Sequence, residues 1–117
     1  YIFAQNMDLK LIDLVIKETI KLESGRTYTV GRNRDNIIPI PSLKARENLT
    51  AAQRELAETI SRYHAELSTE NGTVKIRDKG SSNGTYIGDK RVGTEWTEVQ
   101  PGTAIRLGIG YEILFPE

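Results

Sequence analysis

Short segments in which apolar and polar residues alternate recur along the whole chain. They are rich in β-branched and aromatic residues, and Gly, Pro, Asn and Asp separate them, which is the pattern of half-buried β-strands. The segments predicted as strands are 9–15, 27–30, 37–40, 65–68, 73–77, 96–99, 104–107 and 111–115. Short strands at this spacing predict an all-β protein, either a sandwich or a barrel.

Two tight turns are predicted between these strands. Glu70-Asn71-Gly72 separates two strand segments, and Asn-Gly tolerates the positive φ angles that hairpin turns need. Pro101-Gly102 predicts a second tight turn.

One segment, residues 50–59, breaks the alternation. Its residues are strong helix formers, and Thr50 with Gln53 makes a capping box at its start. The apolar residues that recur in it at four-residue steps are Ala52, Leu56 and Ile60. We therefore expect a short amphipathic helix whose apolar face packs on the sheets, since so short a helix needs tertiary support. Residues 41–48 show no periodicity and are predicted to be a loop, so the helical insert spans about 41–59.

Length and charge limit the classes of protein that fit. With 117 residues the chain suits one domain with a single core. We assign residues 9–117 to this domain and residues 1–8 to a leading linker. Sixteen basic and sixteen acidic residues give zero net charge, which argues against a nucleic-acid-binding domain.

Composition also argues against bound metals, cofactors and lipid. The chain has no cysteine and a single histidine, His64, which leaves too few side chains for most metal sites. Its longest apolar stretches, such as residues 11–16, are far too short to cross a membrane. We expect no cofactor, no metal, no nucleic acid and no membrane contact by this domain.

Three motifs at the ends of predicted strands carry candidate chemistry. They are Gly31-Arg32, Ser61-Arg62-Tyr63-His64 and Gly80-Ser81-Ser82-Asn83-Gly84-Thr85-Tyr86. Guanidinium and hydroxyl groups donate to phosphate oxygens, and glycine lets backbone amides approach an anion closely. Together the motifs supply the parts of a phosphate-binding site.

In this order and spacing the three motifs resemble those of the forkhead-associated (FHA) domain, a phosphothreonine-peptide-binding module. The resemblance extends over about residues 9–115, which is nearly the whole chain. It implies a two-sheet antiparallel β-sandwich of the FHA/SMAD-like type with one short inserted α-helix. It also implies a signalling or assembly adaptor that binds phosphothreonine on a partner, or in its own parent chain, after a Ser/Thr kinase has acted.

The resemblance assigns roles to residues of the three motifs. The residues that would bind the phosphate are Arg32, Ser61, Arg62 and Ser82, with Arg32 as the principal ligand. Asn83 would bind the main chain of the peptide, because an amide both donates and accepts. The residues with loop-shaping or structural roles are Gly31, His64 and Gly84.

Two other functions also fit parts of the sequence. Residues 80–84 also fit the nucleophile elbow of serine hydrolases, Gly-x-Ser-x-Gly, which needs a following helix and a downstream histidine. Here the next residues are predicted as strand and turn, and the histidine lies upstream, so we expect no enzyme. A domain of FHA fold that docks partners independently of phosphate stays open, and binding that survives dephosphorylation would favour it.

The insert and the location are the remaining expectations. About thirty residues separate Arg32 from Ser61, more than FHA domains usually need, and the helix fills the excess. We expect this insert beside the binding edge.

The Asn-Gly-Thr sequon at Asn83 is interpreted as part of a turn and not as a glycosylation site, because a glycan there would block the phosphate site. An intracellular, cytoplasmic location is therefore expected.

Overall fold

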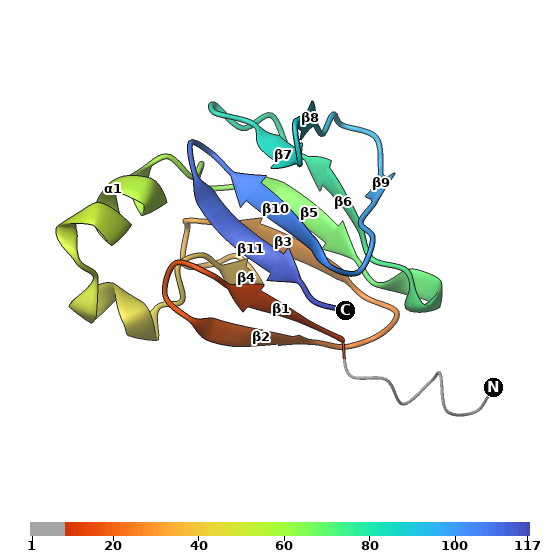
Figure 1. Ribbon diagram of the computed structural model, residues 1–117, viewed down its shortest axis with the longest axis horizontal. Coiled ribbons are helices and arrows are strands. Elements are labelled where there is room, and N and C mark those ends of the chain that lie inside the picture. The colour runs from red at the N-terminus through yellow and green to blue at the C-terminus, as the bar shows by residue number, and fades with distance from the viewer. Residues whose placement is uncertain (1–8) are drawn as a thin grey trace.

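Two packed β-sheets form the body of the protein in a computed structural model that describes residues 9–117 (Figure 1). The predicted leading linker, residues 1–8, lies outside the described residues. The six-stranded sheet has the order β2-β1-β11-β10-β7-β8, and the five-stranded sheet has the order β4-β3-β5-β6-β9. The predicted two-sheet sandwich with one inserted α-helix is confirmed.

Each sheet combines strands from distant parts of the sequence. The strands of the six-stranded sheet are β1 (Leu9–Asp13), β2 (Glu18–Leu22), β7 (Thr85–Ile87), β8 (Lys90–Arg91), β10 (Thr103–Leu107) and β11 (Tyr111–Phe115). The strands of the five-stranded sheet are β3 (Thr27–Gly31), β4 (Ile38–Pro39), β5 (Ala65–Ser68), β6 (Lys75–Asp78) and β9 (Thr97–Glu98). Neighbouring strands pair antiparallel, except that β3 and β4 pair parallel.

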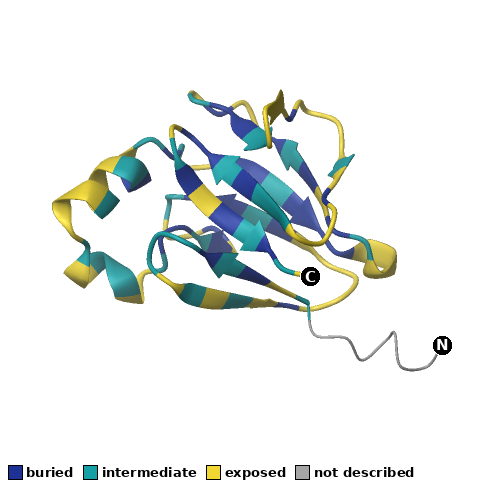
Figure 2. Ribbon diagram, viewed as in Figure 1, coloured by how far each residue is buried: buried dark blue, intermediate teal, exposed yellow. Residues whose placement is uncertain are grey.

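The core lies between the two sheets, and along most strands buried residues alternate with more exposed ones (Figure 2). The largest apolar side chains that are fully buried there include Leu67, Ile76, Ile105 and Leu107. They come from β5, β6 and β10, which occupy central positions in the sheets. The hydrophobic alternation that predicted the strands is thus the pattern of core packing.

A buried polar contact joins the first described strand to the last. The Tyr111 hydroxyl donates to an Asp13 carboxylate oxygen at 2.7 Å, and both residues are almost completely buried. The other Asp13 oxygen accepts from the backbone N–H groups of Val15 and Ile16. These two bonds turn the chain, so β1 ends at Asp13 and not at Val15, where the alternation predicted its end.

Both predicted turns are present. Asn71 and Gly72 have φ angles of 59° and 70° between β5 and β6, as an Asn-Gly hairpin turn requires. Gly102 has a φ angle of 88°, and Thr103 N–H donates to the Gln100 carbonyl across the Pro101-Gly102 turn.

Two short strands were not predicted. β2 has two alternating apolar residues, Ile20 and Leu22, of which only Leu22 is buried. β8 has two residues, both exposed, and forms by pairing with β7. Both strands lie at an edge of the six-stranded sheet, where one face or neither is covered.

The insert contains more helix than predicted. Helix α1 (Ala51–Glu58) has Thr50 as its N-cap, and the capping box with Gln53 is present. The loop prediction for residues 41–48 is wrong in part, because Lys44–Asn48 forms a 3-10 helix. The predicted packing of Ala52 is also wrong. Ala52 is exposed, whereas Leu56, Ala57 and Ile60 face the sandwich, because four-residue steps drift around a helix of about 3.6 residues per turn.

Replacing Tyr111 with phenylalanine tests the contact between the first and last strands. It leaves a buried carboxylate oxygen without its donor, so we expect a loss of about 1.5–3 kcal/mol in the free energy of unfolding, measured by urea denaturation. The matched control is Tyr63→Phe, whose hydroxyl belongs to a side chain in an exposed position. Equal effects of the two variants would contradict a special contribution from the buried pair.

Candidate functional site

Three segments converge at one end of the sandwich. They are the loop after β3 (residues 31–37), the segment before β5 (59–64) and the loop before β7 (79–84), and we call this end the apex. Arg32 N–H donates to the Ser61 carbonyl at 3.0 Å. Ser82 N–H donates to the Ser61 hydroxyl oxygen at 3.0 Å. Ser61 thus lies between the other two segments, and the three sequence motifs meet around it.

Gly31 permits the closest approach in the apex. A Cβ atom at this position would collide with the backbone carbonyl of Arg62. His64 N–H donates to the Val30 carbonyl at 2.9 Å and continues the β3–β5 pairing beside Gly31. Any larger residue would separate these strands, so glycine is required by space here and not by backbone conformation.

The His64 ring joins two loops of the apex from inside the protein. It is 0% exposed. Its Nδ1 accepts from Ser61 N–H at 3.0 Å, and its Nε2 lies 2.8 Å from the Gly84 carbonyl. These partners fix a neutral ring with its proton on Nε2, since a backbone N–H needs an acceptor and a carbonyl needs a donor. Burial lowers the pKa of His64 from its ordinary value and outweighs the opposing effect of the Gly84 carbonyl.

Asp78 shapes the loop before β7. One carboxylate oxygen accepts from the N–H groups of Gly80 and Ser81, and the other accepts from the hydroxyls of Ser81 and Thr85. Burial acts to raise the pKa of Asp78, but these hydrogen bonds outweigh it, so the pKa lies below its usual value. Sequence analysis missed this role. The spacing of Asp78 two residues before Gly80 is an Asx-turn signal that could have indicated it.

The Arg32 side chain is fixed at one nitrogen. Its Nε donates to the Ile60 carbonyl at 2.9 Å, immediately after helix α1. An arginine carries five N–H donors, so four remain on the two terminal nitrogens. The residue is partly exposed. Its guanidinium group is therefore oriented and still able to bind an anion from solvent.

The other candidate residues differ in their exposure and in the hydrogen-bonding groups that are already engaged. The Ser61 hydroxyl accepts from Ser82 N–H, which leaves its own proton for a further acceptor. The side chains of Arg62 and Ser82 are exposed. The Asn83 amide donates to the Thr59 carbonyl at 2.9 Å, so one of its N–H groups is already engaged. Gly84 has a φ angle of 90°, which favours glycine where the loop turns into β7.

A polar cluster that sequence analysis missed supports the loop after β3. The Tyr63 hydroxyl donates to the Asp35 carboxylate at 3.0 Å and accepts from the Asn33 amide at 3.1 Å. The buried Asn36 amide donates to the carbonyls of Asn33 and Arg62 at 2.8 and 2.7 Å. These contacts connect the loop after β3 to the segment before β5.

Four hydrogen bonds connect the insert to the apex and to two neighbouring turns. Ser42 donates to Glu18, and Gln53 donates to the Val15 carbonyl, so the insert meets the β1–β2 turn twice. Arg46 donates to the Arg32 carbonyl at 2.6 Å. At the other end, the Thr59 hydroxyl oxygen accepts from Ile109 N–H of the β10–β11 turn. The insert therefore lies at the apex, beside the candidate residues.

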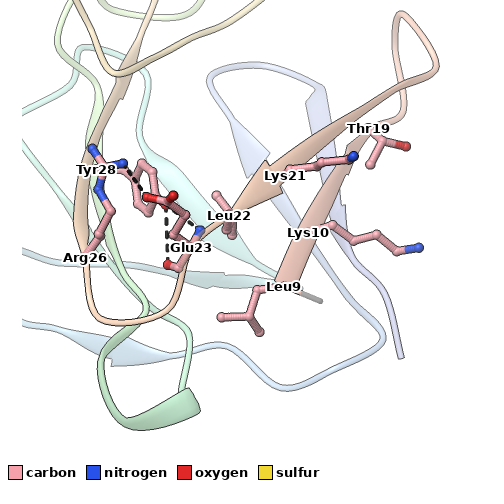
Figure 3. Close-up of a pocket in the computed structure, with 8 residues that line it drawn as sticks. All are labelled: Leu9, Lys10, Thr19, Lys21, Leu22, Glu23, Arg26 and Tyr28. Carbon is pink, nitrogen blue, oxygen red and sulfur yellow. Dashed lines mark hydrogen bonds and ion pairs between the residues drawn. The ribbon is translucent and has the colours of Figure 1, made fainter. Parts of the chain in front are cut away.

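A cavity of about 610 Å³ lies at the opposite end of the sandwich (Figure 3). It is lined by β1, β2, the loop after β2 and the start of β3. Of its charged groups, Glu23 and Arg26 pair with each other at 2.8 Å, and Lys10 and Lys21 also line it. None of the three motifs reaches it. The donors that are oriented by hydrogen bonds lie at the apex and not in this cavity. We therefore place the candidate site at the apex.

Three further observations on the described residues bear on the class of protein. Residues 80–84 lead into strand β7, where a nucleophile elbow needs a helix. Within residues 9–117, no group of three or more His, Asp or Glu side chains is arranged to bind a metal. No helix in that range is long and apolar enough to span a membrane.

The fold and its apical loops define a β-sandwich domain that presents polar groups at one end. A family model described as FHA domain matches residues 28–108, well over half of the sequence. The chain belongs to the FHA-domain family.

Individual relatives agree with this assignment. Protein FraH of Nostoc sp. strain PCC 7120 is 28% identical over 113 residues, which cover 95% of this chain and 36% of FraH. The chain thus spans about a third of that curated relative. The FHA domain of CT664 from Chlamydia trachomatis is 22% identical, with a TM-score of 0.72 over 95% of this chain and 98% of the other. The N-terminal FHA domain of S. cerevisiae Rad53p, solved with a phosphothreonine peptide, is 17% identical, with a TM-score of 0.66 over 93% and 94%. At these identities the two structures show the fold.

His64 predicts a specific pH dependence of stability. Because its pKa is lowered in the folded protein, the unfolded chain binds the extra proton more readily. Its contribution to stability is complete above the ordinary pKa of 6.5 and is lost as the pH falls below that value toward the folded pKa. We expect the single imidazole to titrate below 6.5 in an NMR titration. We also expect a His64→Gln variant to lack this part of the pH dependence of unfolding. A folded pKa at or above 6.5 would contradict the hydrogen-bond assignment.

Proposed function

We propose that this domain binds phosphothreonine-containing segments of proteins. The convergence of three loops on Ser61 carries the proposal, because it brings guanidinium, hydroxyl and amide donors together at one exposed end of the sandwich. Recognition is reversible and involves no chemical step.

Arg32 is the principal phosphate ligand in this proposal. Its Nε is held by the Ile60 carbonyl, so the terminal nitrogens can donate side by side to two phosphate oxygens. The Ser61 hydroxyl donates a further bond, since its oxygen already accepts from Ser82 N–H. Arg62 and Ser82 are exposed beside these groups and complete the phosphate site.

Asn83 is proposed to bind the peptide main chain. One N–H of its amide remains after the bond to the Thr59 carbonyl, and the amide oxygen can accept. An amide that is already oriented loses little side-chain freedom when it binds. Gly31, His64 and Gly84 would act by shaping the loops that present these groups.

The solved relatives support the kind of partner. Rad53p was solved with a phosphothreonine peptide, and another similar structure comes from work on phosphothreonine-dependent FHA domain interactions. For this chain we infer a phosphoprotein partner, or a phosphorylated segment of its own parent chain, produced by a Ser/Thr kinase. We keep the proposal of an intracellular, cytoplasmic setting, where such kinases act.

Replacing Arg32 with alanine tests the phosphate site. A hydrogen bond to a charged group contributes about 1.5–3 kcal/mol, so phosphopeptide affinity should fall about tenfold to a hundredfold or more. Titration calorimetry with phosphopeptides selected from a library measures the effect. Arg32→Lys keeps the charge and loses the paired donors, so it should recover only part of the affinity.

The matched control is Lys21→Ala, which removes one positive charge from an exposed position on β2, away from the apex. It should leave the affinity within about twofold, since exposed charges at a distance are screened. Unchanged binding by folded Arg32→Ala protein would contradict the site. Binding that survives dephosphorylation of the ligand would favour the phosphate-independent docking domain instead.

Phosphothreonine should bind more tightly than phosphoserine in the same peptide. The FHA resemblance implies a small apolar recess for the threonine methyl, and burying one such group contributes about 0.8 kcal/mol, or about fourfold in affinity. Calorimetric titration of the two matched peptides checks this. Equal affinities would show that no recess accepts the methyl group here.

A further inference from the structure

Three arginines lie together on the insert side of the apex, and we call them the arginine cluster: Arg32, Arg34 and Arg46. Arg46 belongs to the 3-10 helix of the insert. Its guanidinium donates to the Pro41 carbonyl at 3.0 Å and to the Arg32 carbonyl at 2.6 Å. These two bonds fix the side chain against the loop after β3, from which Arg34 extends as an exposed residue.

The charges of the cluster are not neutralised within the described residues. The ion pairs among residues 9–117 involve Arg26, Arg77 and Lys79, and none involves the cluster. The nearest carboxylate along the loop, Asp35, accepts its hydrogen bonds from the Tyr63 hydroxyl. In a chain with zero net charge, such a local excess of positive charge is not a consequence of composition.

The electrostatics of Arg46 agree with this geometry. Its pKa is lowered by burial first, and then by the positive charges of Arg32 and Arg34. Tyr111 acts in the opposite direction on this pKa, and no Asp or Glu does. The three guanidinium groups therefore repel one another, and a bound anion would relieve that repulsion.

One phosphate does not account for the whole cluster. Arg32 points its Nε to the Ile60 carbonyl and, in the proposed function, takes the phosphate together with Ser61. Arg46 meets Arg32 at its backbone carbonyl, and Arg34 is two residues further along the loop. These two guanidinium groups are left for a second anionic group close to the first.

We propose that Arg34 and Arg46 form a second anion subsite beside Arg32, which takes an acidic group of the same ligand. That group is a side-chain carboxylate or a second phosphate near the phosphothreonine. The inference rests on the proposed function, since it places the subsite next to the phosphate site. It makes the insert, through Arg46, part of the selectivity of the domain.

A set of phosphopeptides tests the subsite. The reference peptide has phosphothreonine flanked by alanines, and aspartate is then placed at each flanking position in turn. At one or two positions, aspartate should raise the affinity of the unaltered domain by about two- to fivefold, as exposed charge pairs do. A second phosphate at the same position should raise it more, because it carries more charge. Comparing these two peptides distinguishes the two sources of the anionic group.

Variants assign the gain to the cluster. The measured quantity is the ratio of affinities for the aspartate and alanine peptides. It should fall to about one in Arg34→Ala, whereas Lys21→Ala, with the same loss of charge, should keep it. Arg46→Lys, which keeps the charge but loses the two bonds to carbonyls, should lower it in part, and its melting temperature reports any loosening of the insert.

The outcomes separate this inference from the proposed function. If the reference peptide binds in a phosphate-dependent way but no position gains from aspartate, the subsite is wrong and the proposed function stands. The same holds if the gain survives in Arg34→Ala. If no phosphopeptide binds, both proposals fall.

Discussion

The buried His64 imidazole is the contact on which the arrangement of the apex depends. Its two nitrogens bond to Ser61 and Gly84, which belong to two loops that are separate in the sequence. The same two loops are also joined by the bond from Ser82 N–H to the Ser61 hydroxyl and by the bond from the Asn83 amide to the Thr59 carbonyl, so their relative position depends on these contacts together. A neutral, solvent-free ring keeps both partners only while it stays unprotonated.

The insert supports the apex as well as bordering it. The C-cap residue Thr59 and the next residue, Ile60, supply carbonyls just after helix α1, and these accept from Asn83 and Arg32. Carbonyls at the end of a helix lack partners within it, so they are available to orient donors from other loops. Deleting the insert would thus release the two side chains on which recognition is proposed to depend, and could not change flanking selectivity alone.

How far sequence predicts this protein depends on whether each signal is local. The sheets follow from alternation and helix α1 from the capping box at Thr50, and both signals lie within a few residues. Strand β2 was not predicted, because it is an edge strand with one buried residue. The three motifs do meet at Ser61, but the bond from Arg46 to the Arg32 carbonyl joins the insert to the loop after β3 through tertiary packing, and no sequence pattern indicates it. The bonds of Asp78 are local, so its spacing before Gly80 could have indicated them.

The position of the two strands that begin and end the described fold has a consequence for avidity. β1 and β11 are antiparallel neighbours, so Leu9 and Phe115 lie at the same end of the sandwich, away from the apex (Figure 1). In a longer chain, flanking linkers attached there would not have to pass around the domain. The length of the linkers would then set directly how far the apex can extend from the rest of the chain. The effective concentration of the apex at a tethered ligand could be changed in this way without altering any residue that contacts the ligand.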